Sequence, residues 1–257
     1  MAKKGYEDIY EDYVLEDEEF IHEVGNLACK AIRRDFGISF SEEKDISKDD
    51  IRIPIVTFIM CYNEMKKKIQ EIRRTNNSFE INFADRFVFG FDNTDSNVDD
   101  EKDGNFTPYF FNIENNSKSM EYESERNIVE RCRTWVTENV AENPTIITEI
   151  SQATLNDMKE LNIGYNSNVI IPPVIVYVYD QMVKLIKVKR REGGEDGEKL
   201  DELEINFCNC FTIAARETEE NEESAKDNWD DEIVITPDID FKTGVKDDGT
   251  SGFSIEE

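Results

Sequence analysis

Basic side chains are scarce in this chain of 257 residues, and histidine is nearly absent. Lysine and arginine number 30 against 58 aspartates and glutamates, so the formal net charge is −28. A charge of this size repels nucleic acids and anionic membrane surfaces at long range. The single histidine, His22, has no nearby nucleophile and no metal-ligand spacing around it. The composition therefore favours basic protein surfaces, cations or solvent as surroundings, and we expect no enzyme activity.

Long apolar runs are also missing, and we expect no leader segment. No apolar run approaches the roughly 18 residues that span a bilayer, and no signal peptide opens the chain. The cysteines are odd in number and lie within apolar runs, which predicts reduced, buried thiols in a cytosolic setting. They are Cys29, Cys61, Cys132, Cys208 and Cys210. Cys208-Asn-Cys210 has no second Cys or His pair, and the acidic runs lack the order of a calcium loop. We expect no metal and no cofactor.

What the chain does contain is a repeated strand. "FEINFADRFVF" at 79–89 returns as "LEINFCNCFTI" at 203–213, with five of eleven positions identical at an offset of 124. In both copies apolar residues alternate with Glu and Asn, which is typical of a half-buried strand. Apolar residues make up 38% of the chain, enough for a core around such strands.

Other landmarks repeat in the same order. A helix predicted from Glu18 to Phe36 and ended by Gly37 is matched by one from about Pro144 to Leu161. A second helix is predicted from about Pro54 to Arg74. The Ile53-Pro54 pair at its start is matched by Ile171-Pro172 at an offset of 118. Residues 173–192 favour a strand by their β-branched content, whereas their place in the repeat predicts a helix. Thr107-Pro108 and Thr236-Pro237 complete the match, so we interpret the chain as a tandem duplication.

These landmarks predict an α+β protein made of two units, each with the order helix, helix, strand, arm, strand. The units are 18–118 and 144–245, joined by a connector helix at 119–143. Residues 1–17 form an acidic arm without a helical stripe, and 246–257 form an acidic tail. Two units of this kind could pair within one chain or with neighbouring chains.

The order of elements resembles the HU and integration host factor family. That family has a turn like Gly-Phe-Gly-Thr-Phe, to which "FADRFVF" at 83–89 and "FCNCFTI" at 207–213 correspond. Its arm returns through a segment like Val-Pro-Val-Phe-Lys-Pro-Gly, which "FTPYFF" at 106–111 and "ITPDIDFKTG" at 235–244 resemble. Both copies lack the glycines of the family's strand turn.

Both arms also depart from the family, which grips DNA with basic arms and an intercalating proline. The arm from Asp92 to Asp103 has six acids against Lys102, and the arm from Glu217 to Glu232 has nine acids against Lys226; neither has a proline. Lys and Arg contacts supply most non-specific affinity for DNA, and a wedge supplies the kink. DNA wrapping is therefore not expected.

Together these features resemble the integration-host-factor-like structural proteins of crAss-like phages. The resemblance implies a virion protein, made in the host cytoplasm, that forms a homo-oligomeric ring or collar at the portal–tail neck and contacts other virion proteins. Two alternatives stay open: a nucleoid-type DNA-binding protein using the basic clusters at 66–68, 73–74 and 187–191, and an acidic mimic of DNA. Apolar residues amid the acidic extensions are the expected partner anchors. They are Tyr6, Tyr10, Tyr13, Trp229 and Phe253.

Overall fold

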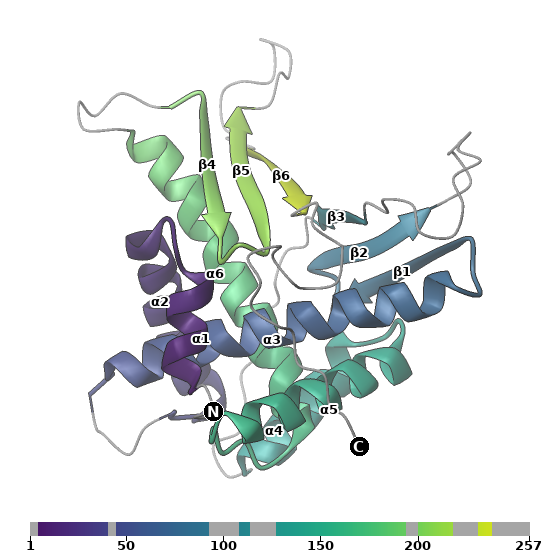
Figure 1. Ribbon diagram of the computed structural model, residues 1–257. Coiled ribbons are helices and arrows are strands. Elements are labelled where there is room, and N and C mark those ends of the chain that lie inside the picture. Colours follow the sequence, from purple (N-terminus) through teal and green to yellow (C-terminus); the bar gives the residue numbers. More distant parts are fainter. Residues whose placement is uncertain are drawn as a thin grey trace.

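The computed structural model describes residues 5–40, 45–92, 108–113, 127–193, 200–217 and 231–237. These ranges hold an α+β fold in which two three-stranded antiparallel sheets lie on helices (Figure 1). The helices are α1 (Tyr6–Tyr13), α2 (Glu18–Phe36), α3 (Lys48–Arg73), α4 (Ile128–Asn139), α5 (Pro144–Glu160) and α6 (Ile171–Glu192), with a short 3₁₀ helix η1 (Asn168–Ile170). The strands are β1 (Ser78–Phe83), β2 (Phe87–Asp92), β3 (Tyr109–Asn112), β4 (Glu202–Phe207), β5 (Phe211–Glu217) and β6 (Asp231–Pro237).

Helix α3 begins at Lys48 rather than at Pro54, so the predicted start is wrong. Ser47 and Asp50 form a capping box, which satisfies free N–H groups of the first turn and fixes the earlier start. Pro54 then lies inside the helix and has no N–H to offer the Asp50 carbonyl. The buried Cys29 thiol of α2 donates to that carbonyl instead, so the interior proline is accommodated by a neighbouring helix.

Helix α6 confirms the helix that the repeat predicts for residues 173–192. Most of its Val and Ile residues are buried against α2, α3 and β4, so tertiary packing overrides their strand preference. With η1 it is also long and apolar enough to cross a membrane, with a mean hydropathy of 1.6 over 18 residues. In this fold 67% of that stretch is buried inside the protein, as befits a core helix.

The repeated "EINF" sequences lie on equivalent strands, β1 and β4, with the same alternation of exposed and buried residues. Each runs into a tight turn without glycine, in which two successive residues have positive φ: Ala84 and Asp85, then Cys208 and Asn209. Asn82 accepts a bond from the Asp85 N–H (3.0 Å), and Asn206 accepts one from the Asn209 N–H (2.9 Å). The repeated asparagine thus replaces the glycines as the support of the turn.

Two of the matched landmarks are out of register. Burial aligns α3 with α6 at an offset of 117 rather than 118, so that Tyr62 and Tyr179 are equivalent. Strand pairing aligns β3 with β6 at an offset of 125: Asn112 faces Phe87 as Pro237 faces Phe211. Pro108 is therefore not the counterpart of Pro237.

The segments assigned as arm and connector are equivalent to each other. The prediction that residues 1–17 lack a helix is wrong, because Tyr6–Tyr13 forms α1 and packs on α3. Its counterpart is α4. Both helices stop at a valine, Val14 or Val140, and both are followed by a residue with positive φ, Asp17 or Asn143, at the start of the next helix. Each unit thus begins one helix earlier than the sequence indicates.

The two halves pair with each other inside one chain. The second helix of each half lies on its own sheet and also reaches the other sheet through an aromatic ring. Phe58 of α3 lies 5.5 Å from Phe207, and Tyr179 of α6 lies 4.7 Å from Phe87, between ring centroids. Strands β3 and β6 lie side by side where the sheets meet (Figure 1). A single hydrophobic core results.

Reciprocal hydrogen bonds join the halves at their strand turns. The Asn206 side chain donates to Glu16 (3.3 Å), and its backbone N–H donates to Asp17 (2.8 Å). On the other side, Asn82 donates to Glu142 (3.1 Å) and Asn143 donates to the Glu80 carbonyl (3.2 Å). The equivalent asparagines therefore hold both the turn and the partner half.

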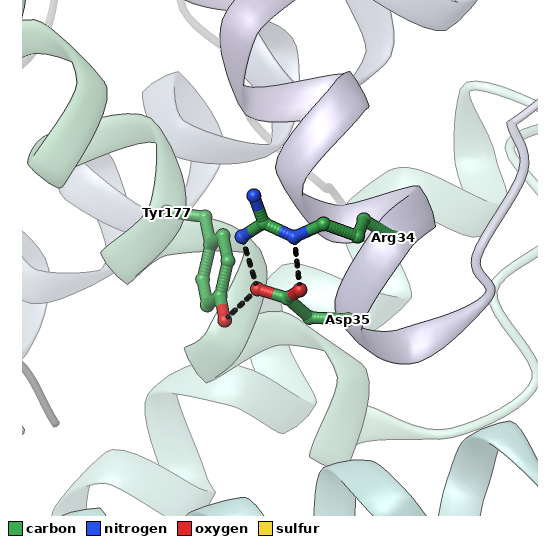
Figure 2. A network of polar contacts seen from close by, with 3 residues as sticks. All are labelled: Arg34, Asp35 and Tyr177. Carbon is green, nitrogen blue, oxygen red and sulfur yellow. Dashed lines mark hydrogen bonds and ion pairs between the residues drawn. The ribbon is translucent and has the colours of Figure 1, made fainter. Parts of the chain in front are cut away.

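One side of the pairing carries polar contacts that the other side lacks. Figure 2 shows Asp35, near the end of α2, accepting bonds from Arg34 and from Tyr177 of α6 (2.8 Å). Burial opposes ionisation of this carboxyl, but the two donors hold its pKa below the usual range. On the other side of the pairing, Leu161 is equivalent to Asp35 at an offset of 126, and Met60 is equivalent to Tyr177 at an offset of 117. Both of these apolar side chains pack against the core.

The second asymmetric contact lies at the strand turns. Arg86 of the first turn forms an ion pair with Asp180 of α6, with 3.2 Å between Nε and Oδ1. The equivalent positions on the other side are Cys210 and Asn63, and there Asn63 donates to the Tyr13 hydroxyl (3.1 Å). A charged pair thus joins the first half to α6, whereas neutral side chains occupy the reciprocal place.

Replacing Gly25 with alanine is expected to destabilise the protein, although a glycine-to-alanine change inside a helix usually raises stability by about 1 kcal/mol. A Cβ at Gly25 would lie 2.6 Å from the Ile51 carbonyl oxygen of α3. Relieving this overlap forces α2 and α3 apart, at a cost of about 1–3 kcal/mol. Urea unfolding measures the change. Gly164→Ala is the control, because its Cβ meets no heavy atom within 4 Å; equal stability of the two variants would contradict the close crossing.

Candidate interaction surface

Both sheets present one face to the helices and one face away from them. Apart from Phe111 of β3, the Phe and Ile residues of the strands point inward. Cross-strand partners share a face, so the outward positions follow from the pairing. The outward rows of the first sheet are Ser78–Asp92, Glu80–Gly90–Tyr109 and Asn82–Val88–Phe111. Those of the second are Glu202–Arg216–Glu232, Glu204–Ala214–Val234 and Asn206–Thr212–Thr236. We call these rows the outer sheet face.

An aromatic pair lies on the outer sheet face at β3. The rings of Tyr109 and Phe111 are stacked, with centroids 5.9 Å apart and planes at 23°. Gly90 makes room for the tyrosine, because a Cβ there would lie 3.0 Å from its ring. The Tyr109 hydroxyl donates to Glu80 (2.6 Å), and burial with this bond raises the tyrosine pKa. Phe111 is 46% exposed, so its ring offers apolar surface on this face.

Carboxylates dominate the charge of the outer sheet face. Five of its described side chains are acidic, and Arg216 is the one cation among them. The acids are Glu80, Asp92, Glu202, Glu204 and Glu232. Arg216 forms an ion pair with Glu202. The face therefore attracts cationic groups and repels phosphates.

A buried ion pair holds the base of the second arm. Asp231, the first residue of β6, pairs with Arg190 near the end of α6, and both are almost fully buried. Arg191 Nε lies 2.8 Å from the second oxygen of Asp231, and Arg190 also donates to the Leu200 carbonyl (2.8 Å) before β4. One carboxylate thus ties helix, strand and arm base together.

Three of the predicted partner anchors pack against their own chain. Tyr10 is 3% exposed, with Arg52 over its ring at 5.2 Å, and burial raises its pKa to about 12. Tyr13 accepts a bond from Asn63, and Tyr6 packs at the edge of the core. Their binding to a partner stays a prediction, but in this arrangement Tyr10 has little surface left to offer. Trp229 and Phe253 lie outside the described residues.

The cysteines are buried thiols throughout. Cys208 and Cys210 lie in the turn between β4 and β5, where burial raises the pKa of the Cys208 thiol well above its usual range and so disfavours the reactive thiolate. His22 is exposed on α2. Across the ranges that the structure covers, no group of three or more His, Cys, Asp or Glu residues is placed to hold a metal ion.

The basic helix ends are matched by acids. Ion pairs join Lys67 to Glu64 (2.5 Å), Lys68 to Glu149 (2.8 Å) and Lys189 to Glu23 (2.9 Å). The last two cross between the halves, so these cations help to hold the pairing. No family model matches this chain, and no curated protein and no solved structure matches it either.

Asp157 on α5 should make stability depend on pH. Burial raises its pKa to about 6, the Glu64 carboxylate adds to the rise, and Lys67 opposes it. Folding therefore favours the protonated form, so this contribution is full below the unfolded pKa of about 4 and is lost as pH rises through about 6. Asp157→Asn should stabilise the protein more at pH 8 than at pH 5.5, measured by urea midpoints. A difference that is the same at both pH values would contradict this account.

Proposed function

We propose that this chain is a structural virion protein, a ring or collar subunit of the phage portal–tail neck that acts through protein–protein contacts. The proposal starts from the resemblance of its two units to the HU and integration host factor fold. The observation that carries it is the excess of acids on the outer sheet face, which holds five carboxylates and one arginine. A DNA grip needs a surplus of lysine and arginine at such a surface.

The pairing of the halves supports the same proposal. Within one chain, the apolar faces of both sheets and their helices are already buried in a shared core, so no second copy is needed to complete the fold. Further contacts between copies can then run through outward surfaces and extensions, as a ring requires.

The mass of the purified chain in solution tests this function, together with an image of its particles by electron microscopy. A closed ring, formed alone or on addition of portal protein, is the expected result. A monomer that ignores portal protein and binds duplex DNA would instead support the nucleoid-type alternative.

An acidic mimic of DNA is the second candidate, and the carboxylates of the outer sheet face favour it. It predicts a complex with a DNA-binding protein that duplex DNA displaces, and no ring.

A further inference from the structure

We propose that the outer sheet face binds an extended, arginine-containing segment of a neighbouring protein, with Phe111 as the anchor. This inference rests on the proposed function, because it names the chemistry of a partner for a subunit that works through protein contacts.

The aromatic pair supplies the docking point. Phe111 is 46% exposed on a strand face, and its ring stacks on Tyr109, which is fixed by its bond to Glu80. A flat, oriented aromatic surface of this kind accepts a guanidinium group by stacking and cation–π attraction. Lysine, a compact and strongly hydrated charge, gains less from such a surface.

The charges around the pair select the same partner. Glu80 and Glu204 occupy equivalent outward rows at an offset of 124, on the outermost strands β1 and β4, with β2, β3, β6 and β5 between them. Ala214 and Val234 complete the row of Glu204 with small apolar side chains, which leaves its carboxylate accessible to an extended chain. Carboxylates spread across the strands of the two sheets match arginines in an extended segment that crosses these strands.

Charge excludes the competing occupants. Residues 238–257 of this chain carry six acids against two lysines, so they share the sign of the face. A second copy would bring its own acidic face, and nucleic acid would bring phosphates. A basic protein segment is the occupant that complements the surface.

Fluorescence anisotropy with labelled oligo-arginine and oligo-lysine peptides of equal length tests the inference on the full chain. The arginine peptide should bind more tightly than the lysine peptide. Phe111→Ala should weaken arginine binding by about two- to fivefold and reduce the preference over lysine. Glu204→Gln should weaken both peptides. Thermal unfolding of each variant checks that the fold is intact.

Matched controls lie on other surfaces of the chain. Leu15→Ala removes an apolar side chain that is 59% exposed before α2, and Glu138→Gln removes an exposed acid of α4. Leu15→Ala should leave arginine binding unchanged, and Glu138→Gln should weaken it only as much as the general loss of one charge predicts.

Three outcomes would overturn the inference. Equal binding by Phe111→Ala and Leu15→Ala would remove the anchor while leaving the proposed function intact. Self-association of the wild type that Phe111→Ala abolishes without peptide would make a second copy the occupant. Tight binding of duplex DNA that Phe111→Ala weakens would contradict both the inference and the proposed function.

Discussion

Replacing Asp231 with alanine should lower the free energy of unfolding by about 3–5 kcal/mol, because it removes the partner of a buried charge. The Arg190 residue that would remain is 1% exposed and cannot reach water without moving the end of α6. The change would also remove the ion pair between Arg191 and Asp231 and loosen the start of β6. Urea unfolding followed by circular dichroism measures the loss.

The neighbouring acid provides the control for this prediction. Glu232 lies one residue further along β6 and is exposed on the opposite face, so Glu232→Ala should change stability little. Replacing Arg190 and Asp231 together with apolar residues should recover much of the loss, since no charge then stays buried alone. A loss below about 1 kcal/mol for Asp231→Ala would contradict the buried pair.

Separating the chain between residues 118 and 119 should leave two halves that do not fold alone. Each half would lose its share of the common core, because α6 packs on α2 and α3, and Phe58 and Tyr179 contact rings of the opposite sheets. Mixing the halves should restore one cooperative unfolding transition and the mass of a one-to-one complex. Circular dichroism with native mass spectrometry provides both readouts.

The same experiment tests whether the halves recognise each other. A homodimer of the first half would place Arg86 opposite Asn63, and one of the second half would place Asp180 opposite Cys210, so each would lack a counter-charge. Asp180 is mostly buried, and burial already raises its pKa despite Arg86. Unpaired buried charge disfavours wrong partners. A folded homodimer of either half that is as stable as the mixture would contradict this view.

The fold class and the repeated strands could be predicted from local patterns. Alternation around "EINF" predicts β1 and β4, and helical spacing predicts α2 from Glu18 to Phe36. Helix α6 shows the limit of propensity, since its Val and Ile residues favour a strand while its buried place between α2 and α3 makes it a helix.

The register of the repeated helices α3 and α6 has a signal in the sequence. "YNEMKKKIQEIRR" at 62–74 matches "YDQMVKLIKVKRR" at 179–191 at an offset of 117, in both cases with Tyr, Met, Lys, Ile and the final Arg pair conserved between the copies. The Ile-Pro landmark gives a different offset because Pro54 lies inside α3, whereas the prolines of α6 lie in its first turn.

Other features had no local signal. Arg190 and Asp231 are 41 residues apart, and only the folded chain brings them together. The docking of α1 on α3 was missed because its buried positions, Tyr10 and Val14, are few among acidic neighbours. The exposure of Phe111 also depends on the tertiary structure, since an aromatic strand is more often wholly buried.

The central claim is that this duplicated fold contacts proteins rather than nucleic acid. A titration of the full chain with labelled duplex DNA at physiological salt tests it most directly. The account predicts a dissociation constant weaker than about 10⁻⁶ M, the tight end of non-specific binding. Tighter binding that weakens steeply as salt rises would contradict it.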